Sequence, residues 1–142
     1  MTGLRLWIGW SALWLILGGT GVAKPRIEPV DAEGYQRYVL VASPEGLAES
    51  RIKASILYAL TANKWKIGKV EDGMINAFHE NGEWAVNLRF RFSATEIEIR
   101  HRSTVFGKPG VNKGWIERLR LTIVERLKIE ARLNSSHPGR RK

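Results

Sequence analysis

The feature that most constrains this chain is an alternation of apolar and polar residues over 83–92, which resumes at Ile97 and Ile99. Successive side chains of a β-strand point to opposite faces, so a period of two predicts two strands with one apolar and one charged face. The polar segment 93–96 between them is the expected turn. The pattern therefore predicts an antiparallel pair in which Phe90 lies opposite Ile99.

A third strand is expected just before this pair, over Met74–Glu80. It is followed by Asn81-Gly82, a dipeptide typical of the two-residue type I′ turn of a β-hairpin. A turn centred on these two residues pairs His79 with Trp84 and keeps the apolar partners on one face. The two hairpins together predict an antiparallel meander.

Apolar residues at helical spacing predict a helix on each side of these strands. Ser43 is expected to cap the first helix, which runs to about Ala62. The second starts at Trp115, and a fourth strand at Lys66–Val70 fits the meander if it contains a bulge. Both helices need an apolar surface to cover. The predicted fold class is therefore α+β: a two-layer arrangement of helix, three- or four-stranded antiparallel meander and helix, with both helices on one sheet face.

The N-terminal segment has the composition of a signal peptide. It combines Arg5 with an apolar run over Leu6–Leu17, and small residues precede Lys24. We expect residues 1–23 to be removed and the protein to be periplasmic, with no transmembrane segment left. The alternative is an uncut leader that anchors the protein in the inner membrane. The chain has no cysteine, so disulfides, thiol catalysis, Cys-based zinc sites and a lipid-carrying N-terminal cysteine are excluded.

The remaining chain divides into three parts by composition. Residues 24–42 are predicted to be a lead-in that can form a short strand at Tyr35–Ala42. Residues 43–133 form the predicted α+β domain, in which the glycine-rich segment Ser103–Gly114 is expected to be a loop. Residues 134–142 are polar and basic and are predicted to be a disordered tail.

The sequence contains no recognisable catalytic motif, whether G-x-S-x-G, H-E-x-x-H or a phosphate-binding loop. His79 and His101 fall on the apolar face, but the predicted register separates them by about 13 Å along the sheet, too far to share a metal ion. We therefore expect a non-catalytic protein with no cofactor and no metal site. The alternative is a small-ligand carrier or enzyme with a pocket between helices and sheet, lined by Trp65, Trp84 and Trp115.

The charged face of the sheet carries the candidate binding residues Arg89, Arg91, Arg100 and Arg102. The register places Arg89 opposite Arg100 and Arg91 opposite Glu98. Like charges directly opposite each other are destabilising, and guanidinium groups fit phosphate and carboxylate groups, so this face is a candidate anion-binding site. The other interpretation is an ordinary solvated face, in which the arginine stems cover the sheet and the charged heads stay in water.

The charge of the chain bears on what such a site would bind. A formal net charge of +9 favours an anionic partner. For an exported protein this means an anionic envelope component or an envelope protein, whereas nucleic acid is disfavoured by the export signal. The sequence specifies no oligomeric state.

The helix ending before Trp65, the turn at Gly73, the alternating strands and Trp115-Ile116 in the last helix resemble a family of small exported proteobacterial proteins. Most members are called hypothetical or putative lipoproteins, and the resemblance covers about Ile52 to Leu127. It implies a helix–meander–helix fold and a periplasmic or envelope location, and it carries over no catalytic residue. The lipidated cysteine of those proteins is missing, so no lipid anchor is expected.

Overall fold

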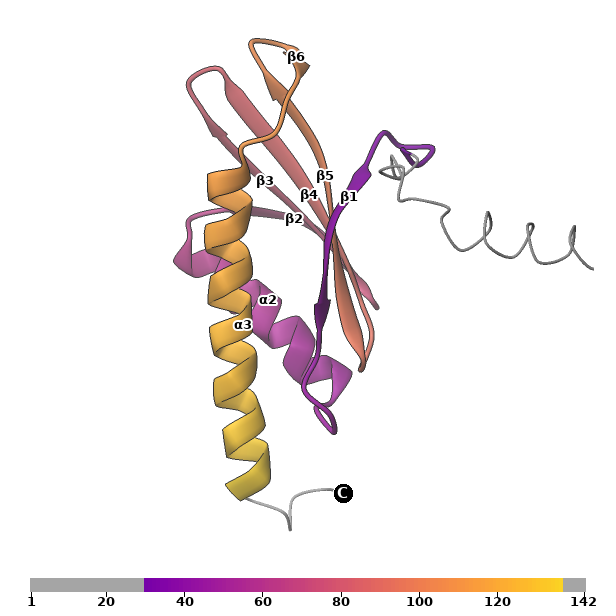
Figure 1. Ribbon diagram of the computed structural model, residues 1–142, viewed down its shortest axis with the longest axis vertical. Helices are drawn as coiled ribbons and strands as arrows, with labels where there is room; N and C mark the ends of the chain where they lie inside the picture. Colours follow the sequence, from indigo (N-terminus) through magenta and orange to yellow (C-terminus); the bar gives the residue numbers. More distant parts are fainter. Residues whose placement is uncertain (1–29, 137–142) are drawn as a thin grey trace, which may run out of the picture.

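The computed structural model describes residues 30–136 as a two-layer α+β fold, with two helices on one face of a six-stranded sheet (Figure 1). The helices are α2 (Glu49–Ala62) and α3 (Lys113–Ser136). The strands are β1 (Gln36–Ala42), β2 (Lys66–Glu71), β3 (Met74–Asn81), β4 (Trp84–Phe92), β5 (Glu96–Val105) and β6 (Lys108–Pro109). The predicted leader, 1–23, and the end of the predicted tail, 137–142, lie outside the described residues.

The sheet is antiparallel throughout and has the order β1-β5-β4-β3-β2, with β6 also paired to β5. Strands β2 to β5 are the predicted meander, so the predicted fold class is confirmed. The strand expected at Tyr35–Ala42, β1, lies beside β5, at the edge opposite β2. Because α2 follows β1 and precedes β2, it connects the two edge strands across one face of the sheet (Figure 1).

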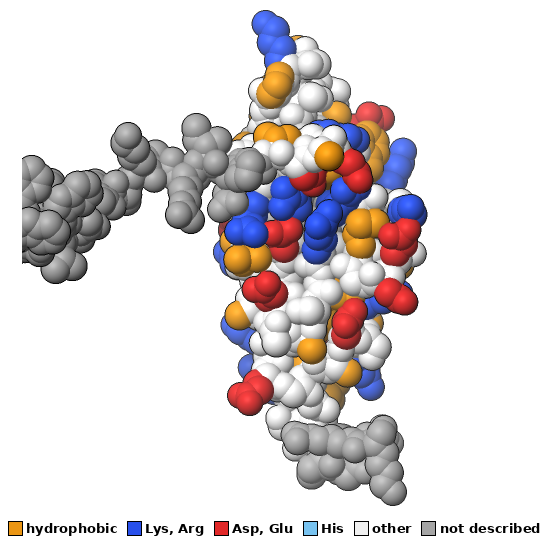
Figure 2. Space-filling model, turned by 90° about the vertical axis from the view of Figure 1, so that its right-hand side faces the viewer, with side chains coloured by type: hydrophobic (Ala, Val, Ile, Leu, Met, Phe, Trp, Pro, Cys, Tyr) orange, Lys and Arg blue, Asp and Glu red, His pale blue; other side chains and the backbone are white. Residues whose placement is uncertain are grey.

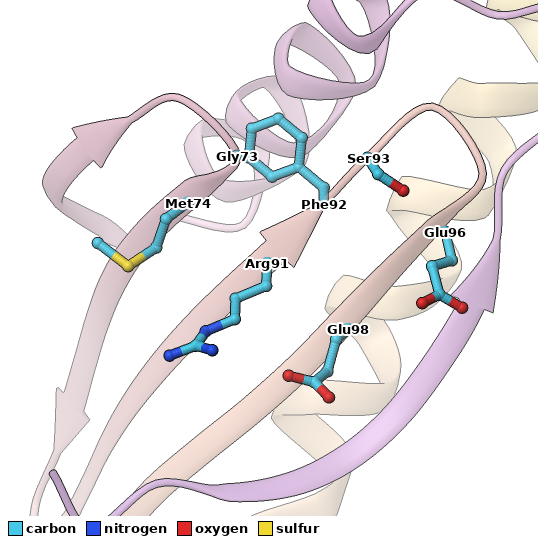
Figure 3. Close-up of a pocket in the computed structure, with 7 residues that line it drawn as sticks. All are labelled: Gly73, Met74, Arg91, Phe92, Ser93, Glu96 and Glu98. Atoms are coloured by element: carbon cyan, nitrogen blue, oxygen red, sulfur yellow. The ribbon is translucent and has the colours of Figure 1, made fainter. Parts of the chain in front are cut away.

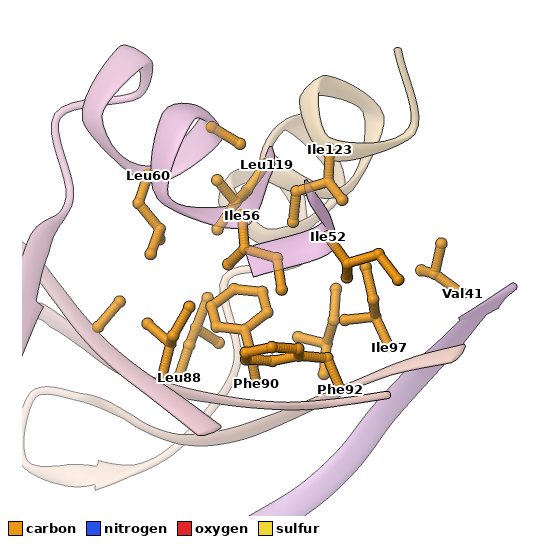
Figure 4. Close-up of a cluster of buried hydrophobic side chains, with 14 of the residues drawn as sticks. Val41, Ile52, Ile56, Leu60, Leu88, Phe90, Phe92, Ile97, Leu119 and Ile123 are labelled. Atoms are coloured by element: carbon orange, nitrogen blue, oxygen red, sulfur yellow. The ribbon is translucent and has the colours of Figure 1, made fainter. Parts of the chain in front are cut away.

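The core lies between the helices and the apolar face of the sheet (Figure 4). Residues four apart in a helix share one side of it, and Ile52, Ile56 and Leu60 of α2 are fully buried. The stripe of α3 is buried as well and consists of Ile116, Leu119, Ile123 and Leu127. Phe90 and Ile99 from the central strands complete the core, so the alternation in the sequence does separate the buried face from the polar one.

The predicted register of the second hairpin is confirmed, since Phe90 pairs with Ile99 and Leu88 with His101. The predicted register of the first hairpin is wrong by two residues. Asn81 pairs with Trp84, and His79 consequently pairs with Val86.

The cause of this shift is the turn, whose first central residue is Gly82. Gly82 has a φ of 58°, and its neighbours in the hairpin do not have positive φ, a pattern typical of a type II′ turn and not of type I′. A shift of two residues leaves every side chain on its predicted face, because the strand repeat is also two.

Both edge strands contain an irregularity. The expected strand at Tyr35–Ala42 is confirmed as β1, whose register shifts between Arg37 and Val39. The predicted bulge in β2 is confirmed as a register shift between Ile67 and Val70. Bulges twist an edge strand and interrupt its row of unpaired backbone groups, which opposes edge-to-edge association.

The predicted start of the first helix is wrong. The backbone N–H of Ser43 donates to the carbonyl of Thr95 at 2.9 Å, which extends the chain beyond β1. A turn follows, in which the N–H of Leu47 donates to the carbonyl of Pro44. The N-cap is Ala48, which has no side-chain hydrogen bond to offer. Proline, serine and an acid are equally typical of turns, so the composition of this segment fits both structures.

Two further boundaries differ from the predictions. The predicted loop at Ser103–Gly114 is wrong in part, because β5 continues to Val105 and β6 follows a two-residue turn. That turn has φ angles of 53° at Phe106 and 74° at Gly107, the two positive values of type I′. The helix α3 continues to Ser136, so the first residues assigned to the disordered tail are helical.

Candidate functional site

The face of the sheet that the helices leave uncovered carries the predicted arginines. Figure 2 looks onto it and shows Lys and Arg side chains gathered together, with acidic side chains beside them. Arg89 of β4 pairs with Arg100 of β5, and Arg91 pairs with Glu98, as predicted. Arg37 of β1 pairs with Arg100 from the other side, so a fifth arginine joins the set.

A short segment that precedes β1, Asp31–Tyr35, contacts this face, and we call it the acidic strap. Its turn is built locally: the Asp31 carboxylate accepts hydrogen bonds from the N–H groups of Glu33 at 3.0 Å and Tyr35 at 2.9 Å. Aspartate commonly stabilises turns in this way. Gly34 has a φ of 87°, which a residue with a side chain rarely adopts.

Arg89 lies directly beneath the strap, and its side chain is only 7% exposed. Its guanidinium donates to the Glu33 carboxylate and, at 3.1 Å, to the side-chain oxygen of Asn76. The guanidinium carbon also lies 4.3 Å from the centre of the Tyr35 ring. A buried charge of this kind requires compensation, which the strap supplies through a carboxylate and an aromatic face.

Arg102 and Arg100 hold the strap by its backbone. Arg102 donates to the carbonyl of Glu33 at 2.8 Å, and its guanidinium carbon lies 4.9 Å from the centre of the Tyr35 ring. Arg100 donates to the carbonyl of Tyr35 at 3.1 Å and forms an ion pair with Asp31 at 3.4 Å. The unfavourable pairing of two arginines is therefore relieved by carboxylate and carbonyl oxygens from a third segment.

The surrounding carboxylates are held in the ionised form. The hydrogen bond from Arg89 lowers the pKa of Glu33 below its ordinary value. Burial alone would raise the pKa of Asp31, but backbone hydrogen bonds and the charges of Arg100 and Arg89 hold it below its ordinary value. Burial acts in the same direction on Glu98, whose pKa is nevertheless lowered by hydrogen bonds from Arg37 and Arg100. Each of these carboxylates therefore neutralises arginine charge.

The remaining predicted residue, Arg91, is exposed, and its charge also helps to lower the pKa of Glu33. Within residues 30–136 it has no hydrogen bond or ion pair, because its partner in the register, Glu98, is bound to Arg37 and Arg100. Arg91 borders a shallow hollow of about 410 Å³ (Figure 3). The hollow is lined by Gly73, Met74, Arg91, Phe92, Ser93, Glu96 and Glu98.

Arg89, Arg100 and Arg102 thus contact the strap directly, whereas Arg91 acts on it only through its charge. The strap was not found from the sequence, where it lies inside the predicted lead-in. In the sequence, the only local indications of this turn are an aspartate two residues before Glu33 and the glycine that follows Glu33. Its partners are 56 to 69 residues away in the chain, a separation that the pattern of a single sequence does not reveal.

Of the three tryptophans named for a pocket, Trp65 and Trp115 pack against the ring of His79, and Trp84 packs against Trp115. The His79 ring lies 5.2 Å from Trp65 and 4.7 Å from Trp115, measured between ring centres, and Trp84 lies 6.4 Å from Trp115. These distances are typical of packed aromatic rings.

His101 has a separate environment. Its ring nitrogen Nδ1 lies 3.2 Å from the Ser103 hydroxyl, its ring meets Tyr38 edge-on, and burial lowers its pKa. Over residues 30–136, no group of three or more His, Cys, Asp or Glu side chains is placed to hold a metal ion.

No protein-family model matches this chain, and a search of curated proteins found no match. Neither helix of the described part of the chain is long and apolar enough to cross a membrane.

Proposed function

We propose that this protein is an exported, non-catalytic protein of the cell envelope that binds an anionic partner through the outer face of its sheet. The observation that carries the proposal is Arg91. It is an exposed guanidinium beside a hollow, and its neighbouring carboxylate is already bound to two other arginines. Such a group binds an external carboxylate or phosphate without first breaking an ion pair.

The net charge of +9 supports the same proposal, because it attracts anionic partners from a distance. The leader-like segment at the N-terminus supports export, with the tethered protein as the alternative. The intact mass of the protein recovered from cells separates these two: we expect a chain that starts at Lys24. A chain that retains Met1 would favour the tethered form.

Binding is tested with two anionic probes, poly-glutamate and vesicles containing phosphatidylglycerol. The variant is Arg91→Gln, and the matched control is Arg118→Gln, which removes the same charge from an exposed position on α3. One arginine near an anionic surface contributes about 1 kcal/mol, so we expect Arg91→Gln to weaken binding about fivefold. The control should bind like the unmodified protein.

The binding should also be lost at about 1 M salt, where the screening length is about 3 Å. The proposal fails if neither probe binds at low salt, or if the Arg91 and Arg118 variants lose the same amount of affinity.

A further inference from the structure

The acidic strap occupies the arginine cluster in the way that a bound peptide would. Within the described residues, its hydrogen bonds and ion pairs outside itself go to Arg89, Arg100 and Arg102. Gly34 also lies directly against an arginine, since a side chain there would come within 3.2 Å of the Arg102 stem. The strap forms its own turn from internal hydrogen bonds, so its shape does not depend on strand pairing.

The strap also controls the charge of this face. Five arginines lie there, and the strap brings the carboxylates of Asp31 and Glu33 to them. Moving the strap away removes both negative charges and uncovers Arg89. The outer face therefore carries two more net positive charges without the strap than with it.

The strap lies outside the strands and helices, so its release breaks no strand pairing, but it exposes Tyr35, which is 5% exposed, and separates Asp31 from Arg100. The Glu33 side chain is 61% exposed, and Arg102 is exposed as well. Water screens only the Glu33 end of its ion pair with Arg89, because the Arg89 side chain is 7% exposed. Arg89 is covered by the strap itself, so opening hydrates its guanidinium and does not leave it as an unpaired buried charge.

We propose that Arg89, Arg100 and Arg102 form a binding site for an acidic turn of another polypeptide, which the strap occupies and thereby blocks in the isolated chain. This inference rests on the proposed function and specifies the partner's chemistry: two carboxylates two residues apart, followed two residues later by an aromatic ring. The chemistry is that of a peptide. Two of the arginine contacts go to backbone carbonyls and two to a ring face, and a phosphate or lipid headgroup offers neither.

The strap is a strong competitor because it is part of the same chain. A short linker holds such a segment at an effective concentration on the order of millimolar. An external peptide with the same contacts therefore binds weakly until the strap is released or its contacts are removed. Weakening the strap should strengthen binding of the external peptide, the opposite of what loss of a binding residue does.

The test uses the full chain and a labelled peptide with the sequence of residues 30–36, VDAEGYQ. The strap variant combines Asp31→Asn with Glu33→Gln, and the matched control combines Glu80→Gln with Glu83→Gln, exposed carboxylates at the β3–β4 hairpin. Both raise the net charge equally. We expect the strap variant to bind the peptide at least about tenfold more tightly than the unmodified protein, and the control to show no such gain.

Two further measurements test whether the gain in affinity is specific to this site and to the carboxylates of the peptide. Adding Arg102→Gln to the strap variant should remove the gain, and because Arg102 is exposed this change does not disturb the core. The peptide VNAQGYQ, which lacks both carboxylates, should not bind. The inference is overturned if the strap variant gains no affinity, if the control gains as much, or if the gain appears only with phosphatidylglycerol vesicles. The proposed function is tested separately, by the difference in affinity for anionic probes between Arg91→Gln and Arg118→Gln.

Discussion

Tyr35 is the residue through which attachment of the strap is best measured. Its side chain is 5% exposed, and its ring contacts two guanidinium groups, those of Arg89 at 4.3 Å and Arg102 at 4.9 Å. Replacing it with leucine retains apolar area but removes the π face that attracts both cations. Replacing it with phenylalanine retains the π face and removes only the hydroxyl.

The magnitude follows from the exposure of each arginine. A cation–π contact contributes about 0.5–1 kcal/mol at an exposed site and about 2 kcal/mol when the cation is desolvated. Arg102 belongs to the first class and Arg89 to the second. We expect Tyr35→Leu to lower the free energy of unfolding by about 2–3 kcal/mol and Tyr35→Phe by less than about 0.5 kcal/mol.

Urea unfolding followed by tryptophan fluorescence measures both values. With a slope of about 2 kcal/mol per M, the leucine variant should unfold at a urea concentration about 1 M lower than the unmodified protein. A double-mutant cycle with Arg102→Gln should recover about 0.5–1 kcal/mol of coupling with Tyr35. Equal losses for the leucine and phenylalanine variants, or no loss for leucine, would refute the proposed role of the ring.

Two further predictions concern the sheet and its charges. As the pH is lowered, the free energy of unfolding should decrease in two stages. Burial lowers the pKa of His101, so the first loss begins below about 6.5 and disappears in His101→Gln. The lowered pKa values of Asp31, Glu33 and Glu98 give a second loss as the pH falls below about 4.5, and this loss is smaller in the strap variant. Urea titrations at a series of pH values test both stages; a curve without slope between pH 7 and 3 would contradict them. Gly73→Ala should destabilise by about 1–2 kcal/mol, because φ is 73° there and a Cβ would lie 3.3 Å from the carbonyl oxygen of Phe92. Gly68→Ala, which meets only ordinary contacts and does not have a positive φ, is the control and should change the unfolding free energy by less than about 0.5 kcal/mol; equal costs would show that backbone conformation is not the cause.

The part of the fold that could be predicted is the sheet, where apolar and polar residues alternate with a period of two. The pairing of Phe90 with Ile99 follows from matching apolar residues on both strands, and the structure confirms it. The same period explains the error in the first hairpin. A shift by two residues conserves the buried face, so only the turn at Gly82 distinguishes the two registers, and one dipeptide is compatible with more than one turn type.

The candidate site was predictable as a surface and not as a set of contacts. The predicted register placed Arg89 opposite Arg100, and because two like charges in this position repel each other, a nearby anion was expected. The anion's source lies some 60 residues earlier, in a segment without periodicity, and local preferences carry no information about such a separation. The helix start near Ser43 was missed for a related reason, because the hydrogen bond that fixes the chain there goes to Thr95.

The position of β1 has a consequence for the order in which the protein assembles. The first strand of the sheet pairs only with β5, and the ion pair between Arg37 and Glu98 spans 61 residues. A chain made or threaded from its N-terminus therefore cannot complete this edge until the hairpin of β4 and β5 has emerged. Contacts of high sequence separation tend to form late, so the strap should close after the meander and helices have packed. Changes in the strap should then alter how fast the protein unfolds far more than how fast it folds.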